Sequence, residues 1–215
     1  MLTSLVAVWM LSAAPASAAP ALADAKEVRS VVESTVNSVL EVLKDKGLSK
    51  DVRKKKVLDV IDPVFDLALM GKLTLGRGHW GKLDEGQKKE FASLFIATIK
   101  DSYYEKIDLF TDETVDFDDP VPGEPGKWQM LTRINSKGQR YGLLYKLYKD
   151  KGKGGWKVYD VEIEGISLIR SYGAQYDQFL QKGTVPGLLA KMKQKDTPGD
   201  LKAATKKSAG KAGKP

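Results

Sequence analysis

A single histidine and a row of three carboxylates are the residues with the most evident capacity for catalysis. His79 is the only histidine among 215 residues, and the chain contains no cysteine. These counts exclude thiol catalysis, iron–sulfur clusters and the usual zinc sites built from several His and Cys ligands. His79 could still act as a lone general base, but its position beside Trp80 in a glycine-flanked segment favours packing at a helix–loop junction.

The three carboxylates, Asp160, Glu162 and Glu164, occupy alternate positions and therefore share one face of an expected strand. Such a row could hydrolyse a glycoside or hold a metal ion. More often it forms the solvent side of a half-buried strand, and the intervening residues here are apolar. Asp160 differs because Trp156 and Tyr159 precede it, so it could fix a turn or a helix end.

Two further patterns could bind phosphate. Gly76-Arg77-Gly78 lacks the preceding strand that a phosphate-binding loop needs. The basic run 53–56 could touch lipid head groups, but its acidic neighbours Asp51 and Asp59 favour a solvated helix face.

The formal net charge of +7 is concentrated at the C-terminus. Residues 193–215 contain seven Lys and two Asp, so residues 24–192 are nearly neutral. The folded part therefore lacks the basic stripe of a nucleic-acid-binding domain, which makes that function a distant alternative. We predict that residues 193–215 are a disordered Lys-rich tail able to make transient contact with a membrane surface.

The N-terminus has the features of an export signal. An apolar stretch, Leu2 to Leu11, precedes Ala16-Ser17-Ala18, which suits signal peptidase. Ten apolar residues are too few to span a bilayer. We predict a signal peptide over residues 1–18, a single domain over residues 24–192, and periplasmic localisation.

Hydrophobic periodicity predicts helices first, then strands, then helices. The first helix is expected at Lys26 to Lys44, a second after the N-cap Ser49, and a third from Phe65 to Leu75, closed by Gly76. The fourth begins at Asp84, where Gln87 completes a capping box, and continues to about Ile107. Residues 167–181 and 185–193 read as two closing helices.

Between these helices the apolar pattern alternates. Residues 116–126 contain three prolines and two glycines and read as a loop. Three strands follow, at residues 128–135, 140–149 and 156–164, joined by short turns. The sequence therefore predicts the α+β class, an antiparallel β-sheet meander covered by amphipathic helices. The same apolar surfaces could form a filled core or enclose a cavity, and the pattern leaves both open.

Several stretches, in order, resemble the MlaC (toluene-tolerance auxiliary) family. They are Phe65-Asp66-Leu67, Leu75-Gly76, His79-Trp80, Gln87 to Phe91, Tyr103-Tyr104, Trp156 to Val161 with Glu164 to Leu168, and Gly183-Thr184-Val185. The resemblance covers roughly residues 57–192. Where the family commonly reads Tyr-Arg-x-x-Phe, this chain has Tyr172-Gly173-Ala174-Gln175-Tyr176.

The resemblance implies a cone-shaped fold with a deep apolar cavity between sheet and helices. The implied function is a non-catalytic phospholipid carrier that needs no cofactor or metal and helps maintain outer-membrane lipid asymmetry. Its implied partners are an inner-membrane ABC transporter complex and an outer-membrane lipoprotein complex. A related branch is associated with hopanoids, and the alternative from another class is an enzyme on a similar scaffold that uses Asp160 or His79 as acid or base.

For a carrier, the acyl chains should contact the apolar faces of the fourth helix and the sheet. The predicted lining residues are Phe65, Met70, Phe95, Ile99, Tyr103, Met130, Leu143, Tyr145, Tyr159, Val161 and Ile163. Arg133 and Arg140 are the candidates for binding a head-group phosphate near the mouth of the cavity.

Overall fold

The structure is a computed structural model that describes residues 18–107, 113–136, 138–152 and 154–194. The signal peptide and most of the tail predicted above lie outside these residues. The described helices are α1 (Ala18–Lys44), α2 (Lys50–Ile61), α3 (Leu67–Trp80), α4 (Glu85–Ile107), α5 (Leu168–Leu180) and α6 (Val185–Lys193). The described strands are β1 (Thr114–Phe117), β2 (Val121–Pro122), β3 (Lys127–Ser136), β4 (Gln139–Lys149), β5 (Trp156–Ile163) and β6 (Ile166–Ser167).

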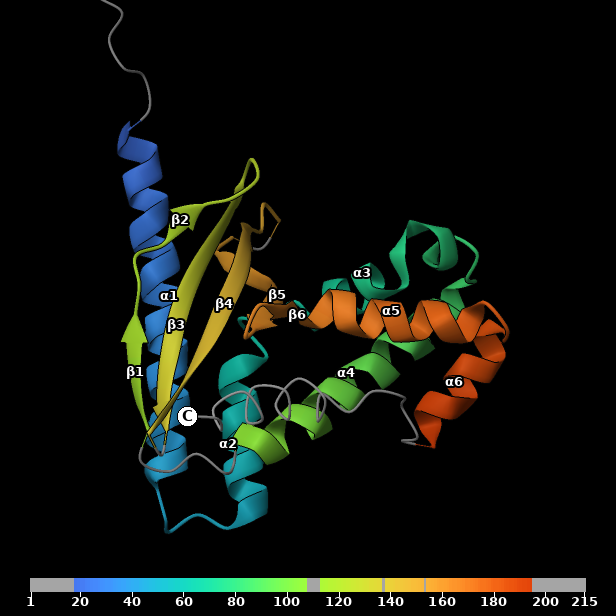
Figure 1. The fold of residues 1–215 in the computed structure, drawn as a ribbon, viewed down its shortest axis with the longest axis horizontal. Helices are drawn as coiled ribbons and strands as arrows, with labels where there is room; N and C mark the ends of the chain where they lie inside the picture. The colour runs from blue at the N-terminus through green and yellow to red at the C-terminus, as the bar shows by residue number, and fades with distance from the viewer. Residues whose placement is uncertain (1–17, 108–112, 137, 153, 195–215) are drawn as a thin grey trace, which may run out of the picture.

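The strands form one antiparallel sheet in the order β1-β3-β4-β5-β6, and β2 also pairs with β3. Helix α1 runs alongside the sheet, whereas α3, α5 and α6 gather at the opposite end of the molecule (Figure 1). The α+β prediction is confirmed. The interpretation of residues 116–126 as a loop is wrong in part, because β1 and β2 use residues from this stretch to extend the sheet beyond β3.

Local sequence signals fix where most helices begin. Asp84 and Gln87 form the predicted capping box, in which the Gln87 amide donates to Asp84 Oδ1 (2.8 Å) and the Asp84 amide donates to Gln87 Oε1 (3.2 Å). Ser49, Ser167 and Thr184 each accept a hydrogen bond from an amide in the first turn of the helix that follows. These bonds satisfy amides that the helix itself leaves without partners.

Helix α3 starts and ends later than the sequence suggests. Its N-cap is Asp66, whose Oδ1 accepts from the Leu69 amide (2.9 Å). Gly76 has φ 63° and ψ 172°, which kinks the helix without ending it, so His79 lies in a final helical turn. A positive φ is accessible to glycine at little cost, and for that reason the chain can change direction here and resume the helix.

A β-bulge in β5 overturns one expectation about the sheet. Lys146 of β4 pairs with Asp160, whereas the next residue, Leu147, pairs with Val158, so Tyr159 is the extra residue. The prediction that Tyr159 shares a face with Val161 and Ile163 is therefore wrong. Tyr159 instead stacks edge-on against Tyr148, at a ring-centroid distance of 6.2 Å, on the opposite face.

The core consists of one large cluster and one small cluster. The large cluster joins the sheet to α1, α3, α4, α5 and α6, and its helical part contains the mutually packed rings of Phe91, Phe95, Tyr172 and Tyr176. The small cluster, Leu43, Val57 and Tyr104, joins the ends of α1 and α4 to α2. Helix α4 therefore connects both clusters.

Helices α3 and α5 cross at a glycine. A Cβ atom on Gly173 would lie 2.9 Å from the carbonyl oxygen of Thr74, so any larger residue would push the helices apart. The packing of α3 on α5 therefore depends on glycine at this position.

Candidate functional site

The three long strands present one continuous side to the helices, which we call the inner face. Alternation and the bulge place twelve residues on it: Trp128, Met130, Thr132, Ile134, Tyr141, Leu143, Tyr145, Leu147, Trp156, Val158, Val161 and Ile163. None of these twelve is an acid, a lysine, an arginine or a histidine. Lys149, which pairs with Trp156 at the end of β4, lies on the same face and forms ion pairs with Asp24 and Glu27 of α1. This composition favours contact with hydrocarbon over chemistry on a polar substrate.

One end of the inner face is closed by α1 and by the segment before α3. Trp128, Leu147, Trp156 and Val158 are buried there in the cluster that also holds the α1 residues Val28 and Val32. The Trp156 indole donates to Glu27 of α1 (3.0 Å). The Val158 amide donates to the Val64 carbonyl (2.9 Å) and its carbonyl accepts from the Asp66 amide (2.9 Å), so this segment extends the sheet.

The other end of the inner face is less completely buried. Ile134, Tyr141, Leu143 and Ile163 lie beyond the bulge and remain only half-buried. Ile134 and Tyr141 lie near the β3–β4 turn, and Ile163 ends β5. The inner face therefore has eight buried residues and one end where four apolar side chains keep exposed surface.

Helix α4 lies across from the sheet but packs chiefly on α3 and α6. Phe95 is buried against Gly71 of α3, and Ile99, one turn further, is the last α4 residue of the large cluster. Tyr104 already belongs to the small cluster, where its hydroxyl donates to the Lys50 carbonyl (3.1 Å). The middle of α4 thus spans the region between the two clusters.

Most of the predicted lining residues come together. Phe65, Met70, Phe95, Ile99, Met130, Leu143, Tyr145, Val161 and Ile163 all belong to the large cluster or pack against it. Tyr159 lies on the other face of the sheet, and the side chain of Tyr103 lies outside the described residues. Contact of this set with a lipid stays a prediction.

Sequence reasoning missed two residues of the half-buried end, Ile134 and Tyr141. Both follow the alternation that identified Met130 and Leu143, so that pattern carried the signal. They sit near the β3–β4 turn.

Three of the twelve residues, Thr132, Tyr141 and Tyr145, carry hydroxyl groups. Burial raises the pKa of Tyr145 to about 12. Thr132 is fully buried. The side chains of Thr132 and Tyr145 are therefore uncharged at neutral pH and provide dipoles without charge.

The two arginines predicted to bind phosphate lie on the outer face of the sheet. Arg133 forms an ion pair with Asp118, and Arg140 pairs with Asp116 (2.7 Å). Side chains alternate along β3 and β4, so these guanidinium groups point away from the inner face. This placement removes the geometric basis for assigning them to the mouth of a cavity on the inner face.

The candidate acid–base groups are engaged in structural bonds. Asp160 is 4% exposed; its Oδ2 accepts from Ser167 Oγ (2.7 Å) and its Oδ1 from the Ile169 amide (3.2 Å). It thereby holds the first turn of α5, as one of the two sequence-based interpretations expected. His79 Nε2 lies 3.0 Å from Asp177 Oδ1 and links α3 to α5. Within the described residues, no group of three His, Cys, Asp or Glu side chains could hold a metal ion.

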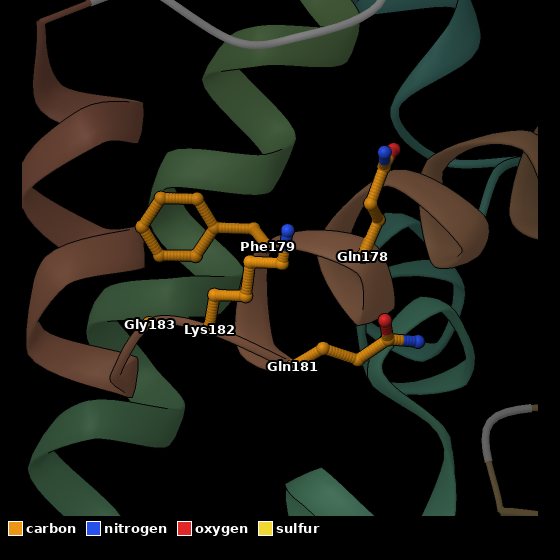
Figure 2. A pocket seen from close by; sticks show the side chains of 5 residues that line it. All are labelled: Gln178, Phe179, Gln181, Lys182 and Gly183. Carbon is orange, nitrogen blue, oxygen red and sulfur yellow. The ribbon is translucent and has the colours of Figure 1, made fainter.

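A surface hollow of about 500 Å³ lies at the turn between α5 and α6. Figure 2 shows its lining residues, Gln178, Phe179, Gln181, Lys182 and Gly183. None of them belongs to the predicted lipid-binding set or to the inner face. The hollow is open to solvent, and it is separate from the half-buried apolar end described above.

Comparison with known proteins identifies the family of this chain. The family model for the MlaC protein matches residues 33–194. The chain is a member of the MlaC family. Its fold is similar to the phospholipid-binding protein from Ralstonia solanacearum, whose structure was determined in complex with a phospholipid. The two share 22% sequence identity with a TM-score of 0.68, over 77% of this chain and 94% of the other.

Membership of the MlaC family confirms the resemblance drawn from the sequence, and the match begins inside α1 and ends just after α6. It therefore includes every strand that contributes to the inner face. Across the residues that the structure describes, no helix is both long and apolar enough to cross a bilayer.

Proposed function

We propose that this MlaC-family protein binds a phospholipid without reacting with it, with the acyl chains against the half-buried end of the inner face. The observation that carries the proposal is the largely apolar inner face, which is closed at one end and half-buried at the other. Leu143 and Ile163 are central to it, and Ile99 of α4 lies in the same cluster. The Ralstonia solanacearum protein of similar fold was determined with a phospholipid, which supports the same ligand class here.

The energetics suit a carrier. Each CH₂ group transferred from water to an apolar site contributes about 0.8 kcal/mol, so two acyl chains would bind tightly. Spontaneous release would then be slow, and a partner that favours a different conformation must promote it. We assign this role to membrane complexes, an inner-membrane ABC transporter complex and an outer-membrane lipoprotein complex, between which the protein would shuttle through the periplasm after export by its signal peptide.

Lipid co-purification tests the proposal directly. The protein should carry phospholipid from its expression host, detectable by organic extraction and mass spectrometry. A hopanoid in the extract would retain the carrier function but change the ligand. Protein that is free of lipid and takes none up from vesicles would contradict the proposal.

A matched pair of variants tests the location. Leu143 and Leu144 are adjacent leucines of β4, both half-buried, and they point to opposite faces of the sheet. Leu143→Trp should fill the space at the open end and abolish lipid retention, whereas Leu144→Trp should leave it unchanged. Added volume in open space costs little, while overpacking a filled core costs about 1–3 kcal/mol. If Leu143→Trp loses that much stability and still retains lipid, the site lies elsewhere.

A further inference from the structure

The distribution of charge divides the molecule into two unlike ends. Residues 67–92 and 168–194, which form α3, the start of α4, α5 and α6, carry nine Lys or Arg and four Asp or Glu. Residues 18–66 and 93–167 carry twenty Lys or Arg and twenty-two Asp or Glu. The first group, which we call the basic end, lies together on the right of Figure 1, away from most of the sheet.

The two ends also differ in which of their charged side chains form ion pairs. Three of the four acids of the basic end are in ion pairs, Glu85 with Lys88 (2.7 Å), Glu90 with Lys193 (2.5 Å) and Asp177 with His79 (3.0 Å), and the fourth, Asp84, caps α4. Six cations of this end have no ion pair within the described part of the chain: Lys72, Arg77, Lys82, Lys89, Lys182 and Lys191. Around the sheet, cations such as Lys127, Lys149 and Arg140 each contact an acid, although Lys151 in the β4–β5 turn forms no ion pair in the described part of the chain.

The C-terminal residues continue from this end. Helix α6 ends at Lys193, and residues 195–215 add six Lys and two Asp but no aromatic residue. The extension is therefore tethered where positive charge is already in excess. Leu73, 41% exposed on α3 beside Lys72, is an apolar side chain among these cations.

We propose that the basic end docks the protein on an anionic phospholipid bilayer, with the lysines of residues 195–215 adding to the attraction. Cations that are spread over several helices match a diffuse negative surface. A specific protein interface would instead centre on buried aromatic or arginine anchors. In this orientation the basic end contacts the lipid head groups. Most of the sheet, including the half-buried end of the inner face, lies away from the membrane surface.

Vesicle co-sedimentation of the full chain tests the proposal. Each basic residue near an anionic surface contributes about 1 kcal/mol, equivalent to about fivefold in binding. Vesicles of phosphatidylglycerol and phosphatidylcholine should bind the protein, pure phosphatidylcholine should not, and salt should weaken binding as the screening length falls below about 10 Å. The triple reversal Lys72→Glu, Arg77→Glu and Lys182→Glu, and separately the removal of residues 195–215, should each reduce binding at least about tenfold.

The matched control reverses three exposed cations elsewhere that have no ion pair in the described part of the chain: Lys46→Glu, Lys56→Glu and Lys151→Glu. This variant should bind nearly as well as the unmodified protein, and co-purified lipid should be the same in all variants. Equal loss in the control overturns the assignment of the surface. No binding of the full chain to anionic vesicles at low salt overturns the bilayer as the partner and leaves an acidic protein surface in its place.

Orientation gives a second readout, because the chain contains no cysteine and accepts single labels cleanly. Gln178→Cys places a label at the basic end, and Lys151→Cys places one in the β4–β5 turn. A quencher attached to lipid head groups should quench the first label and spare the second. Equal quenching of both labels contradicts docking by the basic end.

Discussion

The strongest stability prediction concerns Asp160, which joins the last long strand to the helix that follows. Its carboxylate accepts two hydrogen bonds, from Ser167 Oγ (2.7 Å) and from the Ile169 amide (3.2 Å), and Lys146 Nζ lies 3.4 Å away. Asp160→Ala removes all three contacts. Lys146 keeps its ion pair with Glu162 (2.6 Å), so its charge is not left without a partner.

The size of the effect follows from the burial of these groups. A hydrogen bond to a charged group contributes about 1.5–3 kcal/mol, and a buried donor that loses its acceptor costs a similar amount. Ser167 still caps α5 through the Arg170 amide, which limits the loss to about 3 kcal/mol. For a domain of this size, that corresponds to a decrease of about 6–12 °C in Tm.

Urea and thermal unfolding of Asp160→Ala and Asp160→Asn measure this effect. Asparagine keeps the shape and one acceptor oxygen, so it should cost less than alanine. Lipid content should be retained in whatever fraction remains folded, because the carboxylate holds a helix and touches no ligand. A change below about 1 kcal/mol for alanine would refute this role. Normal stability combined with a complete loss of function would instead revive the acid–base alternative.

Three further predictions address other contacts. Gly173→Ala should cost about 1–3 kcal/mol because its Cβ meets a carbonyl of α3, whereas Gly78→Ala, with open space around its Cβ, should be neutral or stabilising in chemical denaturation. Tyr145→Phe should remove the tyrosine ionisation that an absorbance titration shows near pH 12. The stability that depends on the neutral Tyr145 hydroxyl is present below pH 10 and is lost as the pH rises through the pKa of Tyr145 in the folded protein. The hydrogen bond from Lys149 lowers the pKa of Glu27 below its usual 4.5. The unmodified protein should therefore be more stable than Glu27→Gln above pH 4.5, and this difference should vanish as the pH falls through the pKa of Glu27 in the folded protein.

The long elements could be predicted from the sequence because local signals and periodicity agreed. Asp84 (with Gln87) and Ser49 each cap a helix as a short-range pattern indicated. The alternation in β3 and β4 likewise assigned inner and outer residues correctly. These signals come from residues that are close together in the chain, and the tertiary contacts of the structure agree with them.

Contacts between distant segments decided what the sequence could not. Strand β1 pairs with β3 despite a proline- and glycine-rich continuation, since the edge of the sheet supplies its hydrogen bonds. Gly76 carries a kink where a helix end was expected, because α3 continues to its contact with α5 through His79. The carboxylates that pair with Arg133 and Arg140 come from β1 and the segment after it. No local sequence pattern in β3 or β4 indicates these ion pairs.

The bulge between Lys146 and Leu147 links these departures to the candidate site. It turns Tyr159 outward, and the inner-face residues next beyond it, Tyr145 and Val161, are still buried. On the far side of the bulge, Asp160 faces outward into the start of α5 while its neighbour Val161 faces inward. The strand that presents apolar side chains to the open end is thus the strand that holds α5, and α5 belongs to the basic end.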